Sequence, residues 1–245
     1  MRSHRKSILL NQFLLMLILF STTLFAQGEK LWSLKMAGQN IDASAAIGDI
    51  DRDGHLDIVV GSTIGNVIAL DGYGREIWRV DLKDPISIAP TVADVTGDPG
   101  LEVLVLTISG KVFCLDGLTA KLLWQDHTLG KIKWASMTVI AADINSDGKK
   151  EIIAADEEGT LVCLAGDGKK VWQYNETEGI GSAPAVGDID GDGMAEIIIA
   201  TEETPIICLN QKGEEQWRFK PQGDILASGR KREVAAPVIW DINKS

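Results

Sequence analysis

The chain of 245 residues is 45% hydrophobic and 24% charged, which is the composition of an ordinary globular protein able to bury a sizeable core. This balance does not indicate intrinsic disorder. Its formal charge of -11 disfavours nucleic acid and anionic membrane surfaces as partners, whereas bound cations would relieve the chain's own repulsion.

The first 26 residues have the features of a secretory signal peptide. Arg2, Arg5 and Lys6 precede an apolar run, and small residues before Gln27 mark a cleavage site after Ala26. The alternative is an uncleaved membrane anchor, but the apolar run is short for a span. Cleavage would leave a mature chain with a formal charge of -14 and no membrane insertion. We therefore expect a secreted or extracytoplasmic protein, in the periplasm, on the cell surface or outside the cell.

Two markers then repeat along the chain. A nine-residue frame with acids at alternating positions starts at Asp49, Asp94, Asp143 and Asp188, and breaks off after its start at Asp241. A tryptophan recurs with a similar spacing, as Trp32, Trp78, Trp124, Trp172 and Trp217. The frames start 45, 49, 45 and 53 residues apart, a period that is typical of one four-stranded blade of a β-propeller.

Short β-rich segments lie between each frame and its tryptophan, and no helical periodicity competes with them. The sequence therefore predicts an all-β propeller domain over residues 27–245, following a signal peptide over 1–26. Its four full blades are expected at 44–80, 88–126, 136–174 and 183–219, with a partial first blade and an incomplete blade from 234. Because such an array has unpaired edges, we expect the N-terminal part of a propeller of roughly six to eight blades, or a truncated product.

The frames have the chemistry of a calcium loop. Oxygen donors at positions one, three and five surround a hard cation, position seven offers its backbone carbonyl, and the acid at position nine closes the shell. An EF-hand is excluded, because position twelve falls within an apolar strand. We expect Ca²⁺ at three loops, with these ligands: Asp49, Asp51, Asp53, His55 and Asp57; Asp143, Asn145, Asp147, Lys149 and Glu151; Asp188, Asp190, Asp192, Met194 and Glu196.

The second frame departs from this pattern. Its candidate ligands are Asp94, Thr96, Asp98 and Glu102, but Pro99 takes the place of the glycine at position six and cannot adopt a positive φ. We expect a distorted loop that binds calcium weakly or not at all. The alternative for every frame is a metal-free β-turn rich in Asp and Gly. The expected role of the metal is to fix the turn and neutralise carboxylates, not to perform chemistry.

The three cysteines occupy one repeated position, as Cys114, Cys163 and Cys208, with Ala69 in the remaining copy. Equivalent positions in successive blades are expected to be small, buried packing sites. The sequence therefore predicts free thiols, not disulfide partners.

Two resemblances follow from these motifs. The Asp-rich frames followed by Glu-Ile-Ile-Ile, as at 196–199, resemble FG-GAP repeats of integrin α-chain propellers and many secreted bacterial proteins. The segments 69–78 and 114–124, which end in tryptophan, resemble the tryptophan-docking repeats of PQQ-binding-like propellers. Both imply propeller architecture, and propellers host many unrelated functions.

The integrin-like resemblance also implies a partner surface opposite the calcium loops. That surface would include 82–87, 126–135, 174–182 and the basic insert 221–232. Trp134 lies outside the periodic set, so it is either an exposed binding aromatic or packed over a blade edge. Arg230, Lys231 and Arg232 form a basic cluster that either meets an anionic partner or is simply solvated.

The sequence favours a secreted, calcium-stabilised propeller that is non-catalytic and serves as a cell-adhesion, binding or scaffold module for an extracellular protein or glycan. Two enzymatic alternatives stay open: a PQQ-dependent quinoprotein dehydrogenase-like propeller and a polysaccharide lyase-like, glycan-active enzyme. The chain lacks the adjacent cysteine pair associated with the PQQ pocket. Its three histidines, His4, His55 and His127, have no clustered catalytic partners in the sequence.

Overall fold

The computed structural model describes residues 31–33, 40–132, 137–201, 205–220 and 236–239. The chain divides into two compact units, Met1–Ser33 and Leu34–Ser245. Of the first unit only Leu31, Trp32 and Ser33 are described, and they form no regular secondary structure. The predicted signal peptide lies outside the described residues. A search of the described ranges for an apolar helix of bilayer-spanning length finds none.

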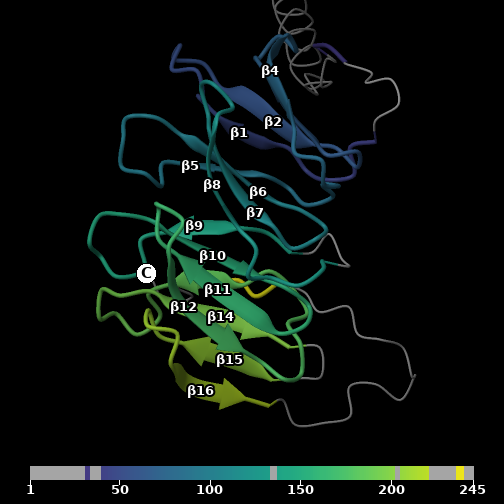
Figure 1. The fold of residues 1–245 in the computed structure, drawn as a ribbon. Coiled ribbons are helices and arrows are strands. Elements are labelled where there is room, and N and C mark those ends of the chain that lie inside the picture. Colours follow the sequence, from purple (N-terminus) through teal and green to yellow (C-terminus); the bar gives the residue numbers. More distant parts are fainter. Residues whose placement is uncertain (1–30, 34–39, 133–136, 202–204, 221–235, 240–245) are drawn as a thin grey trace, which may run out of the picture. The chain divides into compact units, whose positions relative to one another are not determined.

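Among the described residues of the second unit, sixteen strands form four antiparallel sheets, each with its strands in chain order (Figure 1). Blade 1 contains β1 (Ala46–Gly48), β2 (Asp57–Gly61), β3 (Asn66–Leu70) and β4 (Glu76–Asp81). Blade 2 contains β5 (Thr91–Ala93), β6 (Glu102–Leu106), β7 (Val112–Asp116) and β8 (Leu122–Asp126). Blade 3 contains β9 (Ile140–Ala142), β10 (Glu151–Ala155), β11 (Thr160–Leu164) and β12 (Lys170–Asn175). Blade 4 contains β13 (Ala185–Gly187), β14 (Glu196–Ala200), β15 (Ile206–Leu209) and β16 (Glu215–Phe219). The predicted all-β architecture of four four-stranded blades is confirmed.

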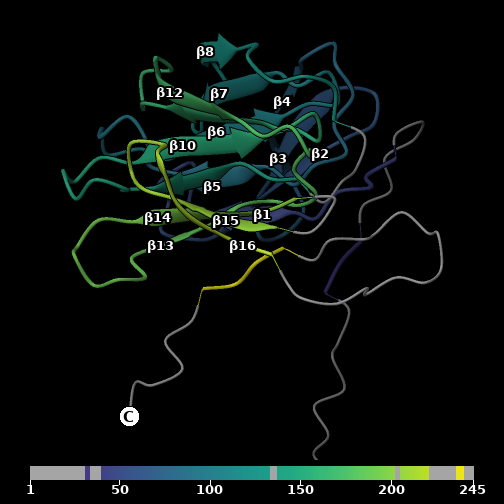
Figure 2. The same cartoon turned by 90° about the horizontal axis from the view of Figure 1, so that it is seen from below.

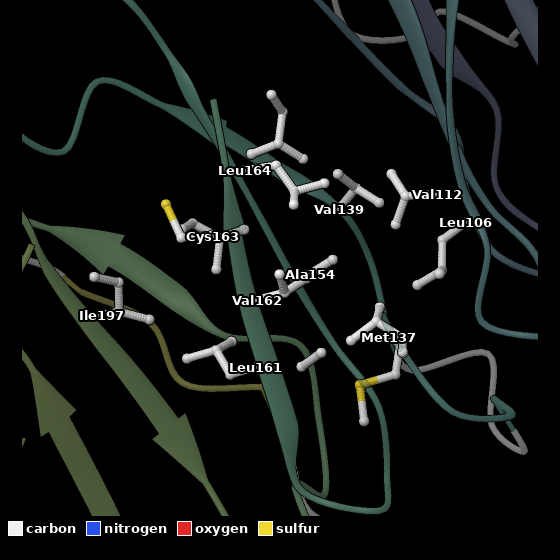
Figure 3. Packing of buried hydrophobic residues seen from close by; sticks show 14 of the residues in the cluster. Leu106, Val112, Met137, Val139, Ala154, Leu161, Val162, Cys163, Leu164 and Ile197 are labelled. Atoms are coloured by element: carbon white, nitrogen blue, oxygen red, sulfur yellow. The ribbon is translucent and has the colours of Figure 1, made fainter. Parts of the chain in front are cut away.

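The second and third strands of each blade form the core. The strands β6, β10 and β14 are buried along their whole length, because both faces of a blade are covered by neighbours. In one hydrophobic cluster, Leu106 of blade 2 and Val162 of blade 3 lie with Ile197 of blade 4 (Figure 3). Each fully buried Ile or Leu side chain contributes roughly 1.5–3 kcal/mol through the hydrophobic effect. The core is therefore shared between blades.

The repeated tryptophans link each blade to the next. The indole Nε1–H of Trp78 donates a hydrogen bond to the carbonyl oxygen of Gly117, at 2.7 Å. Trp124 donates in the same way to Gly166 at 2.8 Å, and Trp172 donates to Gln211 at 2.9 Å. Each donor lies on the fourth strand of one blade, and each acceptor lies in the turn between the third and fourth strands of the following blade. In Figure 2 the fourth strands β4, β8 and β12 lie on one side of the blades and the first strands β1, β5 and β13 on the other.

Glycines make room for two of the docked rings. A Cβ atom on Gly168 would stand 2.6 Å from the ring of Trp124, and one on Gly213 would stand 2.7 Å from the ring of Trp172. Both glycines also have positive φ angles, 81° and 77°, which side chains rarely adopt. The turn therefore needs glycine for its conformation and for its contact with the indole.

The cysteines lie opposite the tryptophans. Trp124, Trp172 and Trp217 pair across the sheet with Cys114, Cys163 and Cys208, and Trp78 pairs with Ala69. All three cysteines are free and buried, as the repeat pattern predicts. The pairing register shifts between each cysteine and the leucine that follows it. Burial raises the pKa of the Cys208 thiol to about 11 and that of Cys163 to about 12. Each thiol therefore stays protonated and fills the space beside an indole.

The predicted incomplete blade is described only at 236–239, where no strand is formed. Ile239 lies 3.3 Å from the point where a Cβ on Gly187 of β13 would stand. In the same way, Val92 of β5 lies 2.7 Å from the point where a Cβ on Gly48 of β1 would stand. Ile239 thus contacts blade 4 as the first strand of blade 2 contacts blade 1. By contrast, Trp217 is 44% exposed, and its indole N–H has no hydrogen-bond partner among the described residues.

A tryptophan substitution tests the docking. Trp124→Phe should lower the free energy of unfolding by about 1–3 kcal/mol, because it removes the N–H donor and leaves the Gly166 carbonyl unpaired. Trp217→Phe is the matched control and should change stability by less than about 0.5 kcal/mol. Urea unfolding of both variants provides the measurement. Equal losses would show that the inter-blade hydrogen bond contributes nothing.

Candidate functional site

The four Asp-rich frames form the loops between the first and second strands of the blades. We refer to them as loop 1 (49–57), loop 2 (94–102), loop 3 (143–151) and loop 4 (188–196). In every loop the buried acid at position nine accepts a hydrogen bond from the backbone N–H at position two. These bonds are Ile50 to Asp57 (3.0 Å), Val95 to Glu102 (2.8 Å), Ile144 to Glu151 (3.1 Å) and Ile189 to Glu196 (3.0 Å). The position-nine carboxylate therefore closes the base of each loop.

Loop 1 turns its carboxylates inward. Asp49 accepts hydrogen bonds from the backbone N–H groups of Asp53 and Gly54, both at 3.1 Å, and Asp51 accepts a third from Asp53. As a result, oxygens of Asp49, Asp51 and Asp53 lie within 4.8 Å of one another. Three like charges at this distance repel, and a hard divalent cation would offset that repulsion.

Loop 4 also gathers three acids, but they are those at positions one, three and nine. Asp188 accepts from the N–H groups of Gly191 at 2.7 Å and Gly193 at 3.0 Å. Oxygens of Asp188, Asp190 and Glu196 lie within 4.8 Å of one another. The donor set is entirely carboxylate, which suits calcium.

Loop 3 repeats the hydrogen bonds of loop 1 with an amide in place of one acid. Asp143 accepts from the N–H groups of Asp147 at 3.2 Å and Gly148 at 2.8 Å, and Asn145 Oδ1 accepts from Asp147 at 2.9 Å. Burial raises the pKa of Glu151, and the negative charges of Asp147 and Asp143 raise it further. In loop 1 the pKa of Asp57 is likewise raised, chiefly by burial.

The residues at position seven, whose backbone carbonyls are the expected calcium ligands, direct their backbone N–H groups into the loops. The backbone N–H groups of His55, Lys149 and Met194 donate to the position-five acids Asp53, Asp147 and Asp192 at 2.8, 2.8 and 2.7 Å.

Loops 1, 3 and 4 also share two left-handed residues, at positions four and six. These are Arg52 (φ 64°) and Gly54 (87°), Ser146 (59°) and Gly148 (83°), and Gly191 (82°) and Gly193 (88°).

Loop 2 has a different geometry. Only Gly97, at position four, is left-handed, because Pro99 occupies position six. Asp94 accepts a hydrogen bond from Gly97 at 2.8 Å, but a proline at position six has no N–H to donate to it. The hydroxyl of Thr96 donates to Glu102 at 3.2 Å. The acids of this fully described loop form no cluster of the kind found in loops 1 and 4.

Position four, which the sequence analysis overlooked, joins loops of neighbouring blades. The guanidinium of Arg52 lies 3.7 Å from the carboxylate of Asp98 in loop 2. The hydroxyl of Ser146 in loop 3 donates to the carbonyl of Gly193 in loop 4. The sequence feature that could have indicated such contacts is a residue other than glycine at position four, where the backbone is left-handed.

The opposite face carries the loops between second and third strands and between blades. Of the partner surface implied by the integrin-like resemblance, 82–87, 126–132 and 174–182 are described. Trp134, Arg230, Lys231 and Arg232 lie outside the described residues. Asp84 is 5% exposed and pairs with Lys111 at 3.0 Å. Asp156 is fully buried and accepts from the N–H groups of Gly130, Glu158 and Thr160 at 2.6–2.9 Å. Buried acids on this face therefore hold the connections in place.

A polar network joins blades 3 and 4 on this face. Arg218 of β16 donates to Glu176 at 2.8 Å and to Glu215 at 2.9 Å. The hydroxyl of Tyr174 lies 3.1 Å from Glu176 and 3.0 Å from Glu215. Hydrogen bonding by Arg218 holds the pKa of Glu215 below its ordinary value. Burial alone would raise the pKa of Glu176, but Arg218 and the other donors lower it overall.

The family described as outer membrane protein assembly factor BamB, a PQQ-type repeat family, matches residues 23–192. The match includes blades 1–3 and the first tryptophan segment. The chain belongs to the BamB family. A second, shorter match covers residues 182–228 of this BamB-family chain and is to the lambda-carrageenase beta-propeller domain.

Individual relatives share only part of their length with this BamB-family chain. An uncharacterized protein of Rickettsia conorii, RC0314, is 28% identical over 60% of this chain and 33% of its own length. The chain spans between a quarter and a third of the curated relatives that it matches.

Among solved structures, Sqt1 of Saccharomyces cerevisiae has a TM-score of 0.57 at 11% identity, over 74% of this chain and 48% of its own. Quinohemoprotein alcohol dehydrogenase of Comamonas testosteroni has a TM-score of 0.51 at 18% identity, over 67% of this chain and 34% of its own. At these identities the two structures show the shared propeller fold alone.

The Arg218 network predicts a pH dependence for this BamB-family chain. Because the folded pKa values of Glu176 and Glu215 lie below 4.5, the network should stabilise the fold above about pH 4.5 and lose this effect as the pH falls through the lowered values. Arg218→Gln should cost roughly 1–2 kcal/mol at pH 7, a value reduced because the arginine is partly exposed. Chemical unfolding between pH 7 and 3 should show the two proteins converging at the acid end. A constant difference across this range would contradict the assignment.

Proposed function

We propose that this BamB-family chain is a non-catalytic binding scaffold that acts outside the cytoplasm, takes a protein partner and is stiffened by calcium. The observation that carries the proposal is the family match over residues 23–192, since the family is described as an assembly factor. An assembly factor works by binding other proteins, which is what an array of rigid blades with long loops on one face can do. Extracytoplasmic location follows from the same description and from the predicted signal peptide.

Calcium is proposed for loops 1, 3 and 4. Two of them gather three carboxylates each, and loop 3 repeats their hydrogen bonds with Asn145 as its third oxygen donor. When bound, calcium would supply positive charge that neutralises these acids and fixes the turn. The chain's net charge of -11 adds a general electrostatic benefit. Loop 2 is not included among these sites, because Pro99 changes its backbone.

A glycan partner is the second candidate. It is favoured by the match of residues 182–228 to the lambda-carrageenase beta-propeller domain. An anionic polysaccharide would be repelled by this acidic chain unless cations bridge the two. The electrostatics therefore favour a protein partner, and a polysaccharide lyase-like activity remains an alternative prediction.

The quinoprotein and integrin-like resemblances give less support to a function than the family match does. A quinoprotein dehydrogenase-like role rests on shared fold, and the three cysteines lie in three different blades, each beside a tryptophan, so they do not provide an adjacent pair. These residues do not fit the PQQ pocket. The FG-GAP, integrin-like role in cell adhesion stays a prediction drawn from the Asp-rich frames.

Thermal unfolding tests the calcium part. At a free concentration ten times the dissociation constant, each site adds about 1.4 kcal/mol, so three sites should raise the midpoint by roughly 10 °C relative to chelator. Asp51→Ala with Asp190→Ala should remove most of this rise. Asp167→Ala is the matched control, because Asp167 is an exposed acid in a turn outside the frames. An unchanged midpoint in calcium, with no metal found by elemental analysis, would refute the calcium role.

Site-specific photo-cross-linking tests the partner. A photoreactive residue at Ile108, which is 36% exposed on the opposite face, should give a discrete protein adduct in the intact source cell. The same residue at Leu122, which is 46% exposed on the outer strand β8, should not. Adducts at both positions, or at neither, would count against the opposite face as the binding surface. Retardation in gels containing lambda-carrageenan would instead favour the glycan candidate.

A further inference from the structure

We propose that Arg52 takes the place of the cation in loop 2, so that the chain binds three calcium ions and supplies the fourth positive charge itself. This inference rests on the proposed calcium binding by loops 1, 3 and 4. It concerns a residue of loop 1 acting on the loop of the next blade.

The guanidinium lies close to two residues of loop 2 that are expected cation ligands, those at positions five and seven. Its Nη2 is 3.7 Å from Asp98 Oδ1, and Asp98 is the acid at position five. The same Nη2 is 2.2 Å from the point where a Cβ on Gly100 would stand, and Gly100 is the residue at position seven. The guanidinium of Arg52 therefore lies beside the carboxylate at position five and beside the residue at position seven of loop 2.

The glycine at position seven is what admits the guanidinium. In loops 1, 3 and 4 this position carries His55, Lys149 and Met194. A side chain at Gly100 would displace the guanidinium of Arg52 from its present place, so the absence of a Cβ there and the position of the arginine fit each other. In loop 2 the glycine at position seven thus leaves the space that the guanidinium occupies.

Two other expected calcium ligands of loop 2, Thr96 and Glu102, form hydrogen bonds within the loop. Glu102 accepts hydrogen bonds from the N–H of Val95 at 2.8 Å and from the N–H and hydroxyl of Thr96, both at 3.2 Å. Pro99 prevents the left-handed turn at position six that the other loops share. Two of the expected ligands therefore hold each other, and a third pairs with arginine.

Loop 3 provides an internal comparison. Its position-four residue, Ser146, also reaches the loop of the next blade, but it brings a neutral hydroxyl. The loop it contacts, loop 4, keeps glycine at position six and keeps its three carboxylates together. A cationic residue at position four thus occurs beside the one loop whose glycine is replaced by proline, which is the arrangement expected if charge has been substituted for metal.

Calcium stoichiometry tests the proposal. Equilibrium dialysis with radioactive calcium at about 10⁻³ M should give three ions per chain for the wild type and three for Asp98→Ala. The double variant Arg52→Ala, Pro99→Gly should bind four, and adding Asp98→Ala to it should return the count to three. Four ions in the wild type with three in Asp98→Ala, or no gain in the double variant, would overturn the proposal.

A second measurement separates this inference from the calcium role itself. If no variant binds calcium, both the proposed calcium role and the predicted ion count fail. The pairing of Arg52 with Asp98 is then judged by thermal unfolding in chelator. Asp98→Asn should lower the midpoint by about 1–3 °C in the wild type and leave it unchanged in the Arg52→Gln background. Equal shifts in both backgrounds would show that the two residues do not interact.

Discussion

The docking of each tryptophan on the next blade is the interaction on which the rest of the structure depends. A single blade cannot bury its own middle strands, because β6, β10 and β14 are covered on both faces by neighbours. The indole of Trp124 provides a large apolar contact and one directed hydrogen bond to Gly166. Both parts contribute to stability, and the hydrogen bond also fixes which point of the next blade is contacted. Cys114, a small and buried side chain, lies opposite Trp124 across the sheet.

The same contacts position the Asp-rich loops. Gly117 accepts the hydrogen bond from Trp78 and donates its own N–H to the carbonyl of Leu101 in loop 2, at 2.9 Å. Gly166 accepts from Trp124, and a Cβ on it would stand 1.8 Å from the carbonyl of Val95 in loop 2. The tryptophan contacts and the loops are therefore neighbouring parts of one interface. Fixing a loop with a cation would also fix the turn that receives the indole, so the proposed calcium would stabilise the packing of blades as well as the loop.

The periodic features could be read from the sequence and the contacts between repeats could not. The spacing of the frames and tryptophans predicts four four-stranded blades, because each repeat carries the same local signals. Pro99 at position six marks loop 2 as the exceptional one, since proline removes both an N–H and a left-handed φ. The pairing of Arg52 with Asp98 depends on how far one blade is rotated relative to the next, as does the network around Arg218. No local pattern encodes that rotation.

The two faces of the blades treat negative charge in different ways. On the opposite face two buried acids are neutralised within the chain, because Asp84 pairs with Lys111 and Glu176 pairs with Arg218. A third, Asp156, accepts hydrogen bonds from backbone N–H groups. On the face with the Asp-rich loops, Arg52 alone among the described residues reaches the acid of a neighbouring loop, and loops 1, 3 and 4 keep their carboxylates unpaired with lysine or arginine. A change in free calcium would therefore act on one face and leave the geometry of the other intact. A scaffold built in this way could gain rigidity from calcium without altering the surface that it offers to a partner.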